Sequence, residues 1–170
     1  MNRIDALEQR ARDATSLRDF GDNSYREGLE ILLDALDREA NLNALGRASI
    51  DMQLVDHLAN RLQVEDWYRR HPEIDEQQIV APLIGLGLPR TGSTALSCLL
   101  AEDPAVRCIR NWEANLPCPP PETATQYTDP RIAKAEAMME RRNHLFPRMK
   151  SMLPSTATLA EVSTSCSEKL

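Results

Sequence analysis

The stretch "LIGLGLPRTGSTALSCLL", residues 83–100, decides the fold of this chain. It begins as an apolar run typical of a buried strand, passes through a turn rich in Gly, Pro, Ser and Thr, and becomes apolar again at helical spacing. A strand that turns through glycines into a helix points several backbone N–H groups at one spot, where the helix dipole adds partial positive charge. The stretch therefore predicts a loop that binds an anion such as phosphate or sulfate.

The loop differs from a Walker A loop, G-x-x-x-x-G-K-[ST], in the position of its cation. Gly87, Gly92 and Thr94 take their Walker positions, but Ser93 stands where the lysine belongs. The cation of this loop is Arg90, whose guanidinium suits two oxygens of a phosphate or sulfate. The loop therefore favours a nucleotide-like anion neutralised by arginine over a magnesium-bound triphosphate.

The N-terminal part, residues 1–76, has the pattern of a helical region. Three segments carry apolar residues at helical spacing, and the third places four of them at i, i+4 intervals: Ile50, Leu54, Leu58 and Leu62. The sequence "DNS" at residues 22–24 offers N-caps for the second segment, and Gly46 marks a break before the third. Pro72 is expected to end the third segment.

Residues 77–153 are predicted to start a P-loop-type α/β domain. The continuous apolar run over residues 79–86 suits a strand buried on both faces of a parallel sheet, and Pro82 places the start of this strand at Leu83. Residues 105–109 form a second, shorter strand candidate.

Two helices are expected in the same part of the chain. One runs from Ser93 to about Glu102, and the other starts at the cap pair Asp129 and Pro130 and ends before Pro147. Residues 154–170 are rich in Ser and Thr and have little periodicity, so they are predicted to form a disordered tail.

Composition narrows the classes of function. The net charge of -6 and the pI of about 5.1 exclude a broad nucleic-acid surface. No window reaches the roughly 18 apolar residues of a membrane span, and the N-terminus has no apolar signal core, so a cytoplasmic protein is expected. The cysteines form no C-x-x-C pair and have no nearby His partner, which predicts reduced thiols and no metal site.

The sequence "LPRTGST", residues 88–94, resembles the 5'-phosphosulfate loop of sulfotransferases, P-[KR]-x-G-[ST]-[ST]. The stretches "FGDNSYREGLEILLDAL", "LANRLQVEDWYRRHPEI", "LLAEDPAVRCIRNWEA" and "PCPPPETATQYTDPRIAKAEA" resemble the bacterial and mycobacterial branch of that family. The resemblance implies a P-loop-type α/β fold. It also implies sulfuryl transfer from 3'-phosphoadenosine 5'-phosphosulfate (PAPS) to a hydroxyl acceptor, which would be a small molecule, a lipid or a carbohydrate.

The resemblance also assigns site residues. It implies that the 5'-phosphosulfate is bound by Pro89, Arg90, Thr91, Gly92, Ser93 and Thr94, with Arg90 also stabilising charge during transfer. Some branches use a glutamate after the second strand as general base, and Glu113 stands in about that place. The alternative for Glu113 is a helix cap or salt-bridge partner, and the neighbouring Trp112 is either a core residue or part of an acceptor pocket.

The resemblance is expected to stop near residue 153, whereas family members continue for well over a hundred residues that include the 3'-phosphate site. The sequence therefore predicts an incomplete sulfotransferase that is weakly active or inactive as this chain. It also predicts possible self-association through an unfinished sheet edge. Two alternatives stay open: a P-loop nucleotide or small-molecule kinase, which the missing lysine disfavours, and a non-catalytic helical interaction protein.

Overall fold

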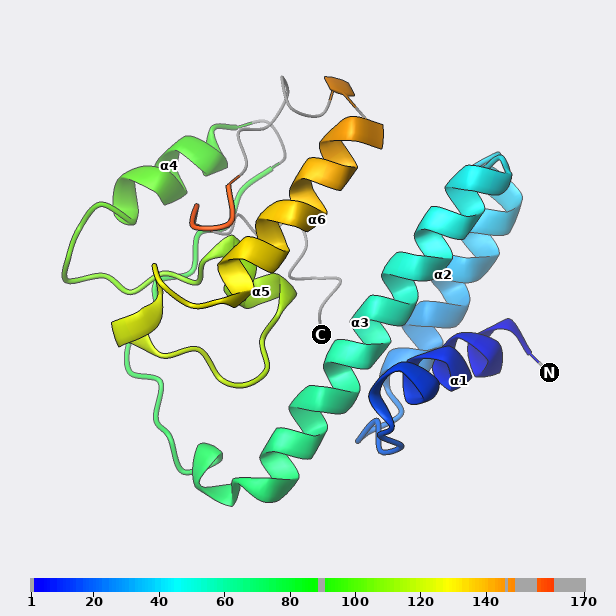
Figure 1. Cartoon of the computed structure of the whole chain (residues 1–170), viewed down its shortest axis with the longest axis horizontal. Helices are drawn as coiled ribbons and strands as arrows, with labels where there is room; N and C mark the ends of the chain where they lie inside the picture. The colour runs from blue at the N-terminus through cyan, green and yellow to red at the C-terminus, as the bar shows by residue number, and fades with distance from the viewer. Residues whose placement is uncertain (1, 89–90, 146, 149–155, 161–170) are drawn as a thin grey trace. The chain divides into compact units, whose positions relative to one another are not determined.

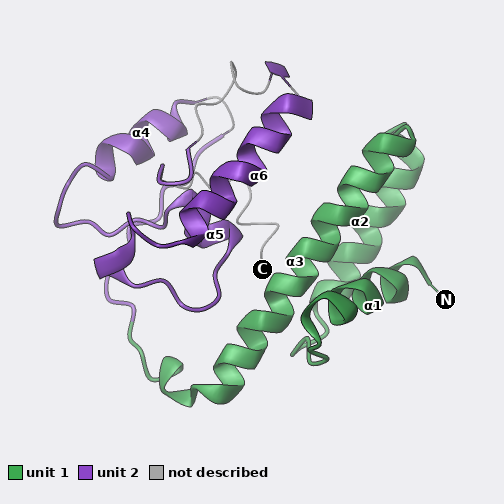
Figure 2. Ribbon diagram, viewed as in Figure 1, with its two compact units in different colours: residues 1–78, 170 green, residues 79–169 purple. Residues whose placement is uncertain are grey.

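The structure is a computed structural model that describes residues 2–88, 91–145, 147–148 and 156–160. The chain divides into two compact units, residues 1–78 and residues 79–169 (Figure 2). The division lies close to the predicted boundary at residue 76. Each unit has a hydrophobic core of its own.

The first unit is helical, as predicted (Figure 1). Its elements are α1 (Arg3–Thr15), α2 (Tyr25–Glu39), α3 (Ala44–Arg70) and the short 3-10 helix η1 (Pro72–Ile74). Helix α1 packs against both α2 and α3. The packed faces bury one apolar cluster: Ile4, Leu7, Ala11, Phe20, Leu33, Val55, Leu58 and Leu62. No helix in the described ranges is long and apolar enough to cross a membrane.

The boundaries of α3 confirm one prediction and correct another. The helix ends at Arg70, just before Pro72, as the sequence predicted. Gly46 does not break the helix; it lies in the first turn of α3, where its N–H donates to the side chain of Asn43 at 2.8 Å. The Asn43 cap satisfies a backbone donor at the helix start, so the interruption falls before Asn43 instead.

A buried carboxylate joins α1 to α2. Glu8 on α1 is only 2% exposed, and its Oε1 accepts a hydrogen bond from the Tyr25 hydroxyl at 2.8 Å. Its carboxylate also pairs with Arg12 at 3.1 Å and with Arg26 at 3.0 Å. Burial, followed by the bond to Glu8, raises the pKa of Tyr25 well above its ordinary value of 10.0, because the neutral phenol can donate to the Glu8 carboxylate whereas a phenolate would face a like charge.

Glu8→Gln is expected to lower the free energy of unfolding of the helical unit by about 1–3 kcal/mol, because two arginines and a tyrosine lose a charged acceptor. The side chain keeps its size, so packing should change little. Urea unfolding measures the loss when it is followed by tryptophan fluorescence in a Trp112→Phe background, where Trp67 in α3 is the remaining tryptophan. The control is Glu30→Gln on the exposed side of α2; an equal loss in both variants would contradict the prediction.

The second unit contains α4 (Ser93–Leu100), α5 (Asn111–Asn115), the 3-10 helix η2 (Thr123–Thr125) and α6 (Arg131–Leu145). Helix α6 begins at Arg131, one residue after the predicted start at Pro130, and the Arg131 N–H donates to the Asp129 carboxylate at 2.8 Å. The prediction that Pro147 ends the helix was wrong, because Pro147 and Arg148 are also helical. Helices α5 and α6 pack together around Trp112, which is fully buried. The second unit therefore has a small core centred on one indole.

The predicted strands do not form in the described part of the chain. Leu83–Leu86 and residues 105–109 are irregular, and the isolated antiparallel bridge between Arg110 and Ala160 is the β-type pairing found there. A strand needs a neighbour for its backbone hydrogen bonds, and a parallel strand also needs cover on both faces. No described segment supplies such a neighbour or such cover to residues 83–86. The regular secondary structure of the described residues is therefore helical, and the expected α/β sheet is not formed among them.

Part of the predicted tail is ordered. Residues 156–160 pack on α5, with Ala157 and Ala160 buried. The backbone N–H of Trp112 donates to the Ala157 carbonyl, and the backbone N–H of Asn111 donates to the Leu159 carbonyl, both at 2.9 Å. The first N–H groups of a helix have no partner within the helix, so these carbonyls cap α5. Residues 154–155 and 161–170 of the predicted tail lie outside the described residues.

Candidate functional site

The predicted anion loop leads into α4 at Gly92. This glycine is the N-cap of α4 and has φ 90°, a left-handed conformation that strains residues with a side chain. No described atom outside its chain neighbours would lie within 4 Å of a Cβ at this position, so the space beside the backbone is open. No side chain of the described residues caps α4. Among the described residues, the start of α4 therefore offers backbone N–H groups to an anion.

The hydroxyl residues of the loop gather at this helix start. Ser93 and Thr94 lie in the first turn of α4, and Thr91 directly precedes Gly92. The Thr91 hydroxyl donates to the Leu88 carbonyl at 2.6 Å, so a hydrogen bond links the residues on either side of positions 89 and 90. Pro89 and Arg90, the other predicted ligands, lie outside the described residues. The structure thus brings Thr91, Gly92, Ser93 and Thr94 together.

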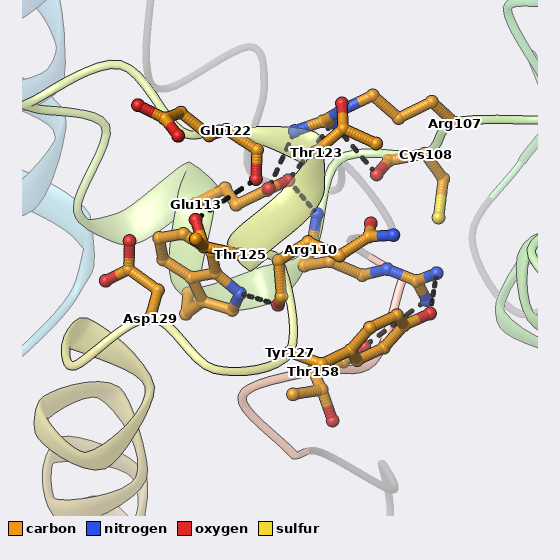
Figure 3. A network of polar contacts seen from close by, with 12 residues as sticks. Arg107, Cys108, Arg110, Glu113, Glu122, Thr123, Thr125, Tyr127, Asp129 and Thr158 are labelled. Atoms are coloured by element: carbon orange, nitrogen blue, oxygen red, sulfur yellow. Dashed lines mark hydrogen bonds and ion pairs between the residues drawn. The ribbon is translucent and has the colours of Figure 1, made fainter.

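The candidate base, Glu113, is at the centre of a polar network (Figure 3). It lies in α5, is 3% exposed, and accepts bonds on both carboxylate oxygens. Arg107 donates to Oε1 at 2.7 Å and to Oε2 at 3.3 Å, and the Arg110 N–H donates to Oε2 at 2.7 Å. Glu113 therefore fills the alternative role considered for it, that of helix cap and salt-bridge partner.

Two arginines that the sequence analysis missed organise this network. Arg107 also donates to the Thr123 hydroxyl at 3.2 Å, so it links Glu113 to the start of η2. Arg110 is buried, donates to the Tyr127 hydroxyl at 2.6 Å and to the Thr158 carbonyl at 3.3 Å, and stacks on the Tyr127 ring (Figure 3). Both arginines lie six residues or fewer before Glu113 in "VRCIRNWE". This cluster of charges was the sequence feature that could have predicted an ion pair with Glu113.

Trp112 is a core residue, and the alternative of an acceptor pocket is not supported. Its side chain is fully buried, and the indole N–H donates to the Gln126 carbonyl at 3.0 Å. The Arg131 guanidinium lies 4.7 Å from the ring centroid. A buried indole whose only polar atom is already bonded has no group left to offer a substrate.

The ion pair of Asp129 makes the stability of the second unit depend on pH. Its carboxylate receives two bonds from the Arg131 guanidinium, at 2.8 and 2.9 Å, and these bonds lower the pKa of Asp129 below its ordinary value of 3.8. A carboxylate with a lowered folded-state pKa stabilises the fold above its unfolded-state value, and this contribution is lost as pH falls through the folded-state pKa.

Asp129→Asn is therefore expected to lower the free energy of unfolding of the second unit by about 1 kcal/mol at pH 6, with the difference from the parent shrinking once the pH falls below about 4. The asparagine can still accept a bond from the Arg131 N–H, so the charge is the main loss. Urea unfolding at pH 6 and below pH 4 measures the difference when it is followed by tryptophan fluorescence in a Trp67→Phe background, where Trp112 is the remaining tryptophan. A difference that is independent of pH would refute the role of the charge.

Comparison with known proteins identifies relatives of this chain. A family model described as "Sulfotransferase family" matches residues 82–166, which is half of the chain. The match includes the predicted anion loop and Glu113. It also extends past residue 153, so the expectation that the resemblance stops there was wrong. No curated protein sequence matches the chain significantly.

Two solved structures resemble the chain closely. Sulfotransferase STF1 from Mycobacterium tuberculosis H37Rv is 32% identical, with a TM-score of 0.74, over 93% of this chain and 44% of STF1. Sulfotransferase STF9 from Mycobacterium avium is 32% identical, with a TM-score of 0.78, over 92% of this chain and 41% of STF9. The chain thus spans less than half the length of either protein.

Proposed function

Because the chain belongs to the sulfotransferase family, we propose that it binds PAPS through residues 89–94 and serves sulfuryl transfer from PAPS to a hydroxyl acceptor. The observation that carries the proposal is the loop at the start of α4, which lies inside the range matched by the family model. Its uncapped helix start, its left-handed glycine and its hydroxyl side chains suit a phosphosulfate group.

The residues present fit the donor. The backbone N–H groups at Gly92 and Ser93 and the hydroxyl groups of Ser93 and Thr94 would hold the 5'-phosphosulfate, and Arg90 would neutralise its charge. The Thr91 hydroxyl would join them once it releases the Leu88 carbonyl, to which it donates its one proton. PAPS itself supplies the activated sulfuryl group. During transfer, the acceptor oxygen bonds to sulfur while the bond from sulfur to the 5'-phosphate breaks, and adenosine 3',5'-bisphosphate leaves. Donors already aimed at the phosphosulfate would stabilise the charge that builds on the leaving phosphate.

The proposed fold of the active enzyme is α/β and of P-loop type, with residues 83–86 as the strand that precedes the loop. The sulfotransferase neighbours support this fold, since the chain aligns with them over nearly its whole length. They are also more than twice as long, so we expect weak or no transfer by this chain alone. The acceptor class is proposed to be a small molecule, lipid or carbohydrate that carries a hydroxyl group.

Isothermal titration calorimetry of the purified chain tests the proposal. We expect adenosine 3',5'-bisphosphate and PAPS to bind without added magnesium, because the loop relies on Arg90 and backbone amides in place of a metal-bound phosphate. Binding of ATP that requires magnesium, without binding of the bisphosphate, would overturn the proposal and favour a kinase. Rapid sulfuryl transfer to hydroxyl acceptors would contradict the expectation of weak activity.

Glu113 is the proposed general base, and its present hydrogen bonds must change before it can accept a proton from a substrate. Arg107 and the Arg110 N–H occupy both carboxylate oxygens, so a substrate hydroxyl must displace Arg107 before it can donate its proton. The Arg107 side chain is 37% exposed, which leaves it room to move. Glu113 would then accept the proton of the acceptor as the new bond to sulfur forms.

Glu113→Gln separates this catalytic role from the structural one. Glutamine still accepts a bond from the Arg110 N–H, so hydrogen exchange of the α5 amides should change little, whereas Glu113→Ala should lower stability by about 1–3 kcal/mol. If Glu113 is the base, Glu113→Gln should reduce residual transfer of radiolabelled sulfate by at least about tenfold. Equal residual transfer by the parent and Glu113→Gln would leave Glu113 with the structural role alone.

A further inference from the structure

Arg107 is the accessible side chain of the polar network around Glu113 (Figure 3). Its side chain is 37% exposed, whereas that of Glu113 is 2% exposed. Arg107 donates to both carboxylate oxygens of Glu113, at 2.7 and 3.3 Å. It also donates to two neutral oxygens, the Thr123 hydroxyl and the Cys108 carbonyl, at 3.2 Å each. A molecule in solution can therefore reach Arg107, and it meets Arg107 before it meets Glu113.

The network holds more positive than negative charge. Arg110 is 8% exposed, and its guanidinium donates to two neutral groups, the Tyr127 hydroxyl and the Thr158 carbonyl. Its Nε atom is buried and has no hydrogen-bond partner in the part of the chain that the structure describes. Among those residues, Glu113 is the single carboxylate paired with either arginine of the network. Buried charge without a counter-charge is costly, so the network favours a further anion.

The other acidic residues drawn in Figure 3 do not provide this counter-charge. The Glu122 side chain is exposed, and its carboxylate points away from Arg107 (Figure 3). Asp129 pairs with Arg131 at 2.8 Å, so those two charges balance each other. The excess positive charge of the network is therefore left for a ligand.

The two oxygens of Glu113 differ in what holds them. Oε2 accepts a bond from the Arg110 backbone N–H at 2.7 Å, so it stays bonded when Arg107 leaves. Oε1 has Arg107 as its one partner among the described residues. An incoming carboxylate presents two oxygens, as Glu113 does, and can take over the Arg107 guanidinium without leaving it unpaired. Oε1 of Glu113 is then free to accept a proton.

We propose that Arg107 selects hydroxyl acceptors that carry a carboxylate. The acceptor carboxylate pairs with Arg107 and draws it away from Glu113, and the acceptor hydroxyl gives its proton to Glu113 Oε1 as its oxygen bonds to sulfur. A neutral acceptor has to break the ion pair without replacing it, so it binds more weakly. This inference rests on the proposed function, since it takes Glu113 as the base.

Matched ligand pairs test the selection directly. The pairs are 4-hydroxyphenylacetate with 4-hydroxyphenylacetamide and glucuronate with glucuronamide, each titrated into the full chain by ligand-observed NMR. We expect the acid to bind at least about tenfold more tightly than its amide in at least one pair, an effect typical of a hydrogen bond to a charged group. Equal binding within both pairs, or no binding by any probe, would overturn the proposal.

Glu113→Gln gives the sharper result, because it removes the group that competes for Arg107. Glutamine keeps the bond from the Arg110 N–H, so the fold should persist. We expect this variant to bind the preferred acid at least about fivefold more tightly than the parent does, with unchanged affinity for the amide. The control Glu122→Gln removes an exposed carboxylate nearby and should change neither affinity. A purely structural Glu113 predicts no gain, so unchanged or weaker binding of the acid would refute the exchange.

Substitutions of Arg107 itself test the assignment through the affinity ratio within a pair. Arg107→Gln should bring the acid and the amide to nearly equal affinity, and Arg107→Lys should lie between it and the parent, because lysine keeps the charge without the planar fork. A general loss of folded protein lowers both affinities alike and leaves the ratio unchanged. Arg141→Gln at an exposed position of α6 removes the same charge and should keep the ratio. A preference for the acid that survives in Arg107→Gln would overturn the assignment.

Two further comparisons separate this inference from the proposed function. Loss of the preference in Arg90→Ala would place the acid in the phosphosulfate loop and overturn the role of Arg107. The titrations contain no PAPS, so binding of adenosine 3',5'-bisphosphate with no preference for acids would refute the selection alone. A preference that depends on Arg107, in a chain that does not bind the bisphosphate, would refute the proposed function and leave Arg107 as a carboxylate-binding residue.

Discussion

Arg90→Ala is expected to weaken the binding of adenosine 3',5'-bisphosphate by roughly 10- to 100-fold, the cost of losing about 1.5–3 kcal/mol of hydrogen bonding to a charged group. The loop holds no lysine at the Walker position, since Ser93 stands there, so Arg90 is its one cation within residues 87–94. The uncapped start of α4 would still attract the phosphate, which is why the loss should be partial. Isothermal titration calorimetry at low and high salt measures it.

Two variants control for this result. Arg18→Ala removes an exposed arginine of the helical unit and changes the net charge equally, so it should leave the affinity unchanged. Arg90→Lys keeps the charge but loses the planar fork that donates to two oxygens, so it should fall between the parent and Arg90→Ala. Unchanged affinity in Arg90→Ala would show that the phosphosulfate loop does not use this cation.

Trp112→Ala is expected to cost the second unit about 3–5 kcal/mol of unfolding free energy, which is the usual range for truncating a buried aromatic residue. The indole is fully buried between α5, α6 and residues 156–160, and its N–H bond to Gln126 is lost with it. A unit with so small a core should unfold under conditions where the parent is folded.

Hydrogen exchange separates the two units in this experiment. The amides of α6 should lose their protection in Trp112→Ala, whereas the amides of α1 and α3 should keep theirs, because the helical unit has its own core. Trp112→Phe keeps most of the apolar volume and is expected to lose less. Unfolding of both units together in Trp112→Ala would contradict the division of the chain into separate cores.

Local signals in the sequence predicted the helices well. The apolar periodicity of residues 1–76 and the cap pair at Asp129 and Pro130 depend on residues close together in the chain, so they specify the same structure in most contexts. The turn at Gly92 was predictable for the same reason, because it requires one glycine and a helix start. The break placed at Gly46 failed because Asn43, three residues earlier, caps the helix and accepts the glycine N–H.

Contacts between distant residues were not predictable from these patterns. A strand forms only with a partner, so the apolar run at residues 83–86 could not reveal that its partner is missing from the described residues. Residues 156–160 contribute mainly backbone carbonyls to α5, and side-chain periodicity does not predict backbone hydrogen bonds of this kind. The pairing of Glu113 with Arg107 likewise depends on a turn that the sequence pattern does not specify.

The exposure of the apolar segment formed by residues 79–88 also sets an order of events during synthesis. The helical unit precedes it in the chain and has a core of its own, so this unit can fold on the ribosome while later residues are still being added. The apolar segment then emerges with nothing in the described chain to cover it. While it is uncovered, it is a surface that chaperones for exposed apolar segments can bind.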